Sequence, residues 1–308
     1  MTEKPLVSVI INCYNGEKYL REAIDSVIAQ TYDNWEIVFW DNQSTDSTAS
    51  IIKSYQDSRF KYFYAQHHTS LGKARNLALE KCNAGLAAFL DSDDIWLPSF
   101  LEKSVERFIK EEDSVSGVYT NYIRFNSQKE SINSDRQEGV VTVSDLIVNY
   151  DVGMSACLFN RKLCYDKNIC FDEKYSLIED FDYFLSIELT HPLYYLSEPL
   201  VKYRMHEESL SVQSKDGWSA EYYDLFNKLK SKGVVKDYPK ELNRLEIRAI
   251  NAEITERINR GERWAVLKIV VKNIYKSPLL LFPLLYVLLG KNAYYKIYYK
   301  IRKTEYSV

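Results

Sequence analysis

Three carboxylates in four residues lie near position 90 of the chain. Asp91-Ser92-Asp93-Asp94 directly follows the apolar segment 87–90. Carboxylates this close repel one another, and a divalent cation removes that repulsion. Mg²⁺ and Mn²⁺ prefer such oxygen ligands and often share them with substrate phosphates. The alternative is a solvated turn in which Asp94 or Ser99 caps the next helix.

Polar residues also follow two earlier apolar segments. They are Asn12-Cys13-Tyr14-Asn15-Gly16 after 6–11 and Asp41-Asn42-Gln43-Ser44-Thr45-Asp46 after 35–40. A third group, Gly72-Lys73-Ala74-Arg75-Asn76, opens a helical pattern and carries positive charge. Taken alone, Asp46 or Ser47 is explained as a helix cap and Arg75 as a surface charge.

The first hundred residues alternate strand and helix patterns. We expect strands at 6–11, 35–40, 60–65 and 86–90, and helices at 20–28, 47–55 and 71–82. This alternation is typical of a parallel sheet covered by helices, whose ligand lies beyond the carboxyl ends of the strands. The polar groups occupy those ends, which favours a ligand site over a solvated turn.

The second half of the chain follows a less regular pattern. We expect strands at 115–125, 154–159 and 200–205, a polar loop at 126–139, and helices at 142–149, 181–189 and from 219 onward. The predicted fold is α/β, with a Rossmann-like, mostly parallel central sheet flanked by helices. The predicted domains are 1–215, divided into halves 1–115 and 116–215, and a helical C-terminal extension, 216–308.

Composition excludes several classes of protein. The 308 residues are 46% apolar and 27% charged, with a net charge of −3, which disfavours general nucleic-acid binding. The chain has neither Gly-x-Gly-x-x-Gly nor a Walker loop, which disfavours dinucleotide oxidoreductases and P-loop enzymes. Five cysteines, no Cys-x-x-Cys pair and no signal-peptide pattern favour reduced thiols and a cytoplasmic protein.

The polar motifs together resemble a known family. Ser8-Val9-Ile10-Ile11-Asn12-Cys13-Tyr14-Asn15, Asp41 to Asp46, Ala74-Arg75-Asn76 and Leu90 to Asp94 occur in that order and at those separations. The set is similar to family 2 glycosyltransferases of the inverting, bacterial surface-glycan type, which have the GT-A fold. The resemblance covers roughly residues 5–212.

The resemblance implies a nucleotide-sugar donor and a metal. Asn12 and Tyr14 would line the base of the nucleotide, and Asp41 would accept a hydrogen bond from that base. Arg75 would lie near the nucleotide, and Asp91 would face the ribose or metal-bound water. Asn15 and Ser92 complete the expected nucleotide-sugar-binding set. Asp93 would bind Mn²⁺ or Mg²⁺ that bridges the diphosphate. The family usually has Pro or Thr at Asn12, and a second Asp with Gly at Asn42-Gln43, so the donor nucleotide stays open.

Two later segments extend the resemblance. Glu179-Asp180 precedes a helical pattern, where acids are favoured by the helix dipole and capping alone would explain them. By resemblance Asp180 is the catalytic base, which takes a proton from the acceptor hydroxyl. Tyr203 to Ser211 resembles the family's Tyr-Arg-x-His-x-x-Ser-x-Ser segment, which implies that His206 completes the metal site or contacts the diphosphate.

The predicted function is therefore inverting transfer of a sugar, with a UDP-sugar as the favoured donor, to a hydroxyl of a glycan or lipid-linked acceptor. One alternative is a sugar nucleotidyltransferase, whose usual Gly-rich loop and Lys are poorly matched by Asn15-Gly16-Glu17-Lys18. The other is a nucleotide-sugar-binding or scaffolding relative without turnover. The retained Asp91, Asp93 and Asp180 disfavour that alternative.

The C-terminal segment differs in charge from the rest of the chain. Residues 1–262 contain 31 basic and 42 acidic residues, and residues 263–308 contain nine and one. The tail includes the twelve-residue apolar run 278–289, too short for a spanning helix, which needs about 20 residues. We expect 263–308 to lie on an anionic membrane surface, as a peripheral protein at the inner face of the cell membrane. The alternative is packing on the domain or on a second copy.

Overall fold

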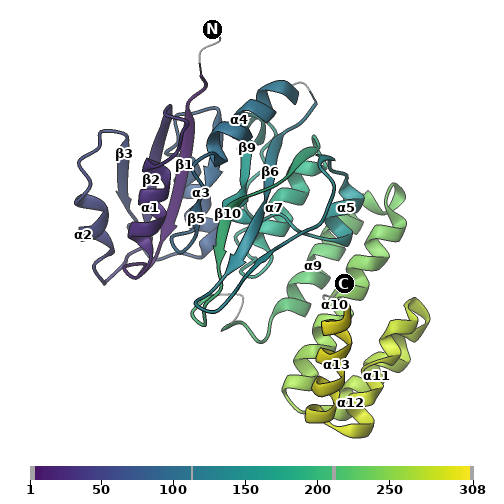
Figure 1. Cartoon of the computed structure of the whole chain (residues 1–308). Coiled ribbons are helices and arrows are strands. Elements are labelled where there is room, and N and C mark those ends of the chain that lie inside the picture. Colours follow the sequence, from purple (N-terminus) through teal and green to yellow (C-terminus); the bar gives the residue numbers. More distant parts are fainter. Residues whose placement is uncertain (1–3, 112–113, 210–212, 306–308) are drawn as a thin grey trace. The chain divides into compact units, whose positions relative to one another are not determined.

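The computed structural model describes residues 4–111, 114–209 and 213–305, with side chains up to Tyr298. Two compact units make up the chain, residues 1–209 and 210–308 (Figure 1). The first holds a sheet flanked by helices, and the second is helical. An α/β fold with a helical C-terminal region, as the sequence predicts, is therefore confirmed.

The first unit is built on one large sheet with strand order β3-β2-β1-β4-β9-β6-β10-β5, in which β7 adds to β6 and β8 to β10. The strands are β1 (Val7–Cys13), β2 (Trp35–Asp41), β3 (Phe60–Tyr64), β4 (Leu86–Phe89), β5 (Ile95–Trp96), β6 (Gly117–Phe125), β7 (Glu130–Ile132), β8 (Gly139–Val140), β9 (Cys157–Asn160) and β10 (Leu193–Arg204). Strands β1 to β4 run parallel, and β9 enters antiparallel between β4 and β6.

Helices connect the parallel strands, because parallel neighbours need a crossover connection. They are α1 (Leu20–Ile28), α2 (Thr48–Lys53), α3 (Leu71–Leu79), α4 (Phe100–Glu111), α5 (Val143–Val148), α6 (Arg161–Asp166) and α7 (Glu179–Glu188), with a 3₁₀ turn η1 (Met154–Ala156). Alternate residues of β1, Val7, Val9 and Ile11, are fully buried in a core shared with Leu20 and Ile24 of α1.

Three expectations for the second half of the unit differ from the structure. The polar loop 126–139 contains β7 and the start of β8, which pair with neighbouring strands despite their polar sequences. The strand expected at 200–205 begins at Leu193, because β10 continues past a bulge at Pro199. The strand expected from 154 begins at Cys157, after the turn η1.

The second unit consists of helices around their own apolar core. They are α9 (Trp218–Ser231), η2 (Val234–Lys236), α10 (Pro239–Asn259), α11 (Arg263–Asn273), η3 (Ile274–Lys276), η4 (Pro278–Leu281), α12 (Leu284–Leu289) and α13 (Lys291–Glu305). The apolar run 278–289 contributes Leu280 and Tyr286 to this core, but leaves Leu279, Leu288 and Leu289 exposed. In the part of the chain that the structure describes, no helix is long and apolar enough to cross a membrane.

Candidate active site

The carboxyl ends of β1 and β2 meet at one edge of the sheet, where Cys13 is paired with Asp41. The loops that follow them are bonded to each other. The Asn15 N–H donates to Ser44 Oγ at 3.0 Å, and the Thr45 N–H donates to Asn15 Oδ1 at 2.8 Å. Asn15 has φ of 54°, a left-handed conformation that asparagine tolerates. Asn15 therefore fixes the shape of both loops.

The loop after β1 also packs against the acidic loop that follows β4. A Cβ on Gly16 would lie only 2.4 Å from Cys13 Sγ and 3.2 Å from Ser92 Oγ, so this close approach requires glycine. Burial raises the pKa of the Cys13 thiol to about 11, although the Ser92 hydroxyl beside it lowers the pKa. Ser92 thus lies at the contact between the two loops.

Asp41 lies at the end of β2 and is fully buried. Its Oδ1 accepts a hydrogen bond from the Ser44 N–H at 2.7 Å, and its Oδ2 accepts one from the Tyr62 hydroxyl at 2.8 Å. Both carboxylate oxygens therefore hold the β2 loop and β3 together. In this conformation Asp41 offers no exposed oxygen to the base of a nucleotide.

Tyr14 is half exposed at the same edge, and its ring centroid lies 4.4 Å from that of His68. His68 Nδ1 is 2.8 Å from the Asn42 backbone oxygen, and the Asn42 side chain bonds to Thr69. No sequence motif marks His68. The departure from the family pattern at Asn42 thus tethers the loop that places His68 beside Tyr14.

Asn12 lies at the expected edge, but its amide is shielded from solvent. Neither its nitrogen nor its oxygen has a hydrogen-bond partner among the described residues. Trp40, its neighbour in the parallel register, has an indole N–H in the same condition. Buried polar atoms normally have hydrogen-bond partners, so a water molecule or a ligand atom is expected to supply the partners of these two side chains.

Asp94 is a structural member of the acidic loop. It is buried, its Oδ2 accepts a hydrogen bond from Ser155 Oγ at 2.6 Å, and its Oδ1 accepts one from the Arg204 N–H at 2.9 Å. Ser155 Oγ also accepts a hydrogen bond from the Asp91 N–H at 3.0 Å. Asp94 therefore ties the loop to η1 and β10. It does not cap the next helix, as the alternative interpretation had it.

Asp93 and His206 come together although 113 positions separate them. Asp93 Oδ2 lies 2.7 Å from His206 Nε2, and the Asp93 backbone oxygen accepts a hydrogen bond from Arg204 Nε at 2.8 Å. His206 Nδ1 is buried without a partner among the described residues. The Asp93 carboxylate is the kind of oxygen ligand that Mn²⁺ and Mg²⁺ prefer. No group of three metal-ligating side chains occurs in the described ranges, so such a metal would need further ligands from substrate and water.

Arg75 lies under the acidic loop with only 4% of its side chain exposed. Its Nη1 donates to Glu179 Oε1 at 2.9 Å, and its Nη2 donates to Asp91 Oδ1 at 3.2 Å. It therefore joins the end of β4 to the start of α7. The sequence predicts that Arg75 lies near the nucleotide, and the structure pairs it with Asp91 and Glu179.

Arg75 is surrounded by three carboxyl groups, those of Asp91, Glu179 and Asp180. Burial raises the pKa of Glu179 to about 7, with Arg75 opposing and Asp180 and Asp91 reinforcing the rise. Burial likewise raises the pKa of Asp91, opposed by Arg75 and reinforced by Asp93 and Asp180. Asp91 thus lies within electrostatic reach of both the Asp93–His206 pair and Asp180. The sequence alone did not identify Glu179 as the partner of Arg75.

Asp180 lies in the first turn of α7, as expected from its position in the chain. Its Oδ1 accepts a hydrogen bond from the Phe181 N–H at 2.7 Å. Burial raises the pKa of Asp180, while Arg75 and the Tyr150 hydroxyl lower it. The site therefore presents a carboxylate at a helix N-terminus, separate from the Asp93–His206 pair. Tyr150 and Ser155 were missed in the sequence, because neither belongs to a recognisable motif.

Comparisons with known proteins identify the family. The family model described as Glycosyl transferase family 2 matches residues 8–166 of this chain. The chain is 31% identical over 214 residues to the UDP-Glc:alpha-D-GlcNAc-diphosphoundecaprenol beta-1,3-glucosyltransferase WfgD of Escherichia coli, covering 67% of this chain and 79% of that protein. It is 39% identical over 121 residues to the putative teichuronic acid biosynthesis glycosyltransferase TuaG of Bacillus subtilis, covering 39% of this chain and 47% of that protein.

Solved structures give the same fold. S. aureus TarS 1-349, in complex with UDP-GlcNAc, is similar with a TM-score of 0.64 at 20% identity, covering 96% of this chain and 91% of that chain. At this identity the likeness shows the fold alone. With the family match and the similarity to WfgD, it follows that the chain is a GT-A glycosyltransferase that belongs to glycosyltransferase family 2.

Proposed function

We propose that the protein is an inverting glycosyltransferase that moves a sugar from a UDP-sugar to a hydroxyl of a lipid-linked or surface glycan. The observation that carries this proposal is the approach of Asp93, His206, Asp91 and Asp180 to one edge of the sheet. The names of similar proteins support the substrates: WfgD uses UDP-Glc and a diphosphoundecaprenol acceptor, and TarS was solved with UDP-GlcNAc.

Asp180 acts as the base in this proposal. Its carboxylate takes the proton from the acceptor hydroxyl while that oxygen attacks the anomeric carbon and the bond to the nucleoside diphosphate breaks. One displacement inverts the configuration, so no second carboxylate is needed as a nucleophile. The raised pKa of Asp180 makes it a stronger proton acceptor than an exposed aspartate.

Asp93 and His206 would hold a Mn²⁺ or Mg²⁺ ion, which would stabilise the charge of the leaving diphosphate. Asp94 and Arg204 keep Asp93 in place through hydrogen bonds to the backbone of the opposite segment. The tether is independent of the Asp93 carboxylate. Removing that carboxylate should therefore spare the fold.

Metal dependence is tested with Asp93→Ala. We expect loss of UDP release from UDP-glucose and UDP-GlcNAc in Mn²⁺ or Mg²⁺, with an unchanged thermal transition. Excess EDTA should abolish release by the unmutated protein. Glu207→Ala removes an exposed acid next to His206 and should behave as the unmutated protein. Full turnover in EDTA would contradict metal dependence.

The same assay separates the alternatives. A binding or scaffolding relative would be stabilised by UDP-sugars in a thermal-shift panel, because a ligand that binds only the folded state raises its melting temperature, but would release no UDP. A sugar nucleotidyltransferase would make the nucleotide sugar from a sugar phosphate and a nucleoside triphosphate. We expect neither result.

We also propose that the second unit associates with an anionic membrane surface. One face of α11, extended into η3, carries Trp264, Val271 and Tyr275 with 75%, 67% and 80% of their surfaces exposed. The exposed Lys268 and Lys272 lie on that face too, since all five positions recur at helical spacing. Aromatic and basic side chains on one helix face suit the headgroup layer. A second copy docked face to face would bring these lysines together.

Lys268→Glu/Lys272→Glu tests this surface. Each basic residue near an anionic membrane contributes about 1 kcal/mol, so the double change should weaken binding to phosphatidylglycerol vesicles by at least about 30-fold at 0.1 M salt. Lys162→Glu/Lys167→Glu, a pair of exposed lysines at α6, is the matched control and should sediment normally. Equal sedimentation of both variants, or none by the unmutated protein, would show that the face serves another purpose.

A further inference from the structure

Tyr150 follows α5 and has a hydroxyl that is shielded from solvent. This hydroxyl makes no hydrogen bond of normal geometry with the described residues. A buried hydroxyl without a partner costs stability, so its retention calls for an explanation. No sequence motif marks this residue.

The surroundings of this hydroxyl are acidic. The Tyr150 ring packs against Phe181, with centroids 4.8 Å apart, at the start of α7. Burial raises the pKa of Tyr150 well above its ordinary value, and the negative charges of Asp180 and then Glu179 raise it further. The hydroxyl therefore faces the carboxylate that we propose as the base.

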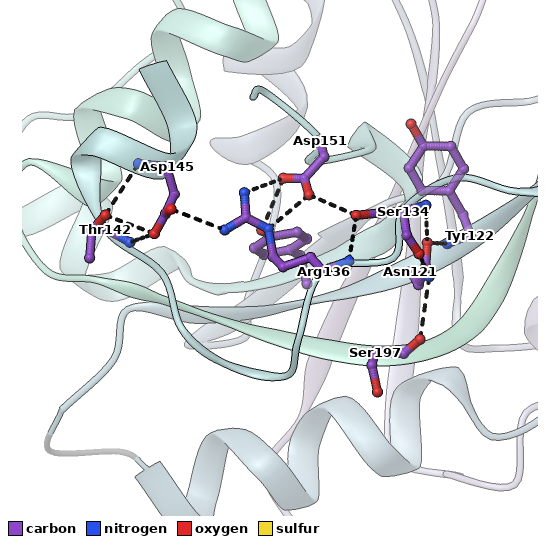
Figure 2. A network of polar contacts seen from close by, with 9 residues as sticks. Asn121, Tyr122, Ser134, Arg136, Thr142, Asp145, Asp151 and Ser197 are labelled. Atoms are coloured by element: carbon purple, nitrogen blue, oxygen red, sulfur yellow. Dashed lines mark hydrogen bonds and ion pairs between the residues drawn. The ribbon is translucent and has the colours of Figure 1, made fainter. Parts of the chain in front are cut away.

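A polar network fixes the chain next to Tyr150 (Figure 2). Asp151 accepts hydrogen bonds from Arg136 Nε at 2.9 Å, from the Tyr119 hydroxyl at 3.1 Å and from Ser134 Oγ at 3.3 Å. Arg136 also pairs with Asp145 of α5 at 3.5 Å. The residue after Tyr150 is thus anchored to β6 and to the segment 134–136. This anchoring restricts how far the tyrosine can move from α7.

We propose that Tyr150 is a positioning residue for Asp180: its hydroxyl donates a hydrogen bond to the nearby Asp180 carboxylate, and holds that carboxylate ionised and aimed at the acceptor hydroxyl. The inference rests on the proposed role of Asp180. Tyr150 itself gives up no proton. It leaves one carboxylate oxygen to receive the proton of the acceptor.

Tyr150→Phe tests the inference, because phenylalanine keeps the ring against Phe181 and removes only the hydroxyl. A hydrogen bond to a charged group is strong enough that we expect kcat to fall about 10- to 100-fold. Without this donor the base is protonated more easily, so the acidic limb of the kcat profile should move to higher pH. The KM for the UDP-sugar should not change, since the base that Tyr150 positions is proposed to act on the acceptor.

Tyr183→Phe is the matched control. It removes another shielded hydroxyl, from α7 itself, whose electrostatic neighbours are cysteines rather than Asp180. We expect its pH profile to match that of the unmutated protein. If Tyr150→Phe alters only the melting temperature, or shifts the profile no more than Tyr183→Phe does, the inference is wrong.

A readout without turnover separates this inference from the proposed function. The carboxyl resonance of Asp180, assigned by its loss in Asp180→Asn, is titrated by NMR in the unmutated protein and in Tyr150→Phe. An upward shift of the Asp180 pKa in Tyr150→Phe supports the positioning role even if no acceptor is found. An unchanged pKa overturns it, whether or not the protein transfers sugar.

Discussion

Asp180→Asn should lower kcat by about 10²–10⁴, the usual contribution of a general base. Asparagine has nearly the same size and can still accept a hydrogen bond from the Phe181 N–H, so the first turn of α7 should remain intact. The KM for the UDP-sugar should hardly change, because the lost group acts on the acceptor. The measurement is steady-state UDP release with a synthetic lipid-linked sugar diphosphate as acceptor.

Glu179→Gln is the informative comparison. Glu179 is bonded to Arg75 and lies almost fully buried, so its replacement should affect stability more than chemistry. We expect Glu179→Gln to keep kcat within about tenfold of the unmutated protein, well above the residual rate of Asp180→Asn. The reverse order of the two variants would move the role of base from Asp180 to Glu179.

The sequence predicted the first half of the fold because local signals there agree with the tertiary structure. Short apolar runs become β1, β2 and β4, and polar residues after them mark the edge of the sheet. In the second half, β7 is exposed and polar, and β10 runs through Pro199. These strands are specified by pairing with β6, which no pattern within their own sequences reveals.

The candidate site was predictable where family motifs mark it. Asp93 and His206 were matched by motif and lie 2.7 Å apart. Burial, in contrast, could not be predicted from residue type. Asp41 and Arg75 belong to the predicted motifs, yet their polar atoms form hydrogen bonds with neighbouring protein groups. Such pairings depend on contacts between distant segments, which one sequence does not display.

Arg75→Met should lower the free energy of unfolding by about 3–5 kcal/mol, the usual effect of removing one partner from a buried ion pair. Methionine fills a similar volume but leaves Asp91 and Glu179 without their cation. Urea unfolding followed by circular dichroism gives the change. Arg21→Met, at an exposed position of α1, should leave the free energy of unfolding nearly unchanged.

The loss in Arg75→Met should also depend on pH. The pKa of Glu179 is raised in the folded protein to about 7, above its unfolded value of about 4.5, so its ionisation costs stability as pH rises through that interval. Without Arg75 the carboxylates are harder still to ionise, and protonation at low pH relieves their repulsion. The destabilisation should therefore be larger at pH 8 than at pH 5.5. An equal loss at both values would mean that Arg75 acts through packing alone, against Phe89 and Phe171.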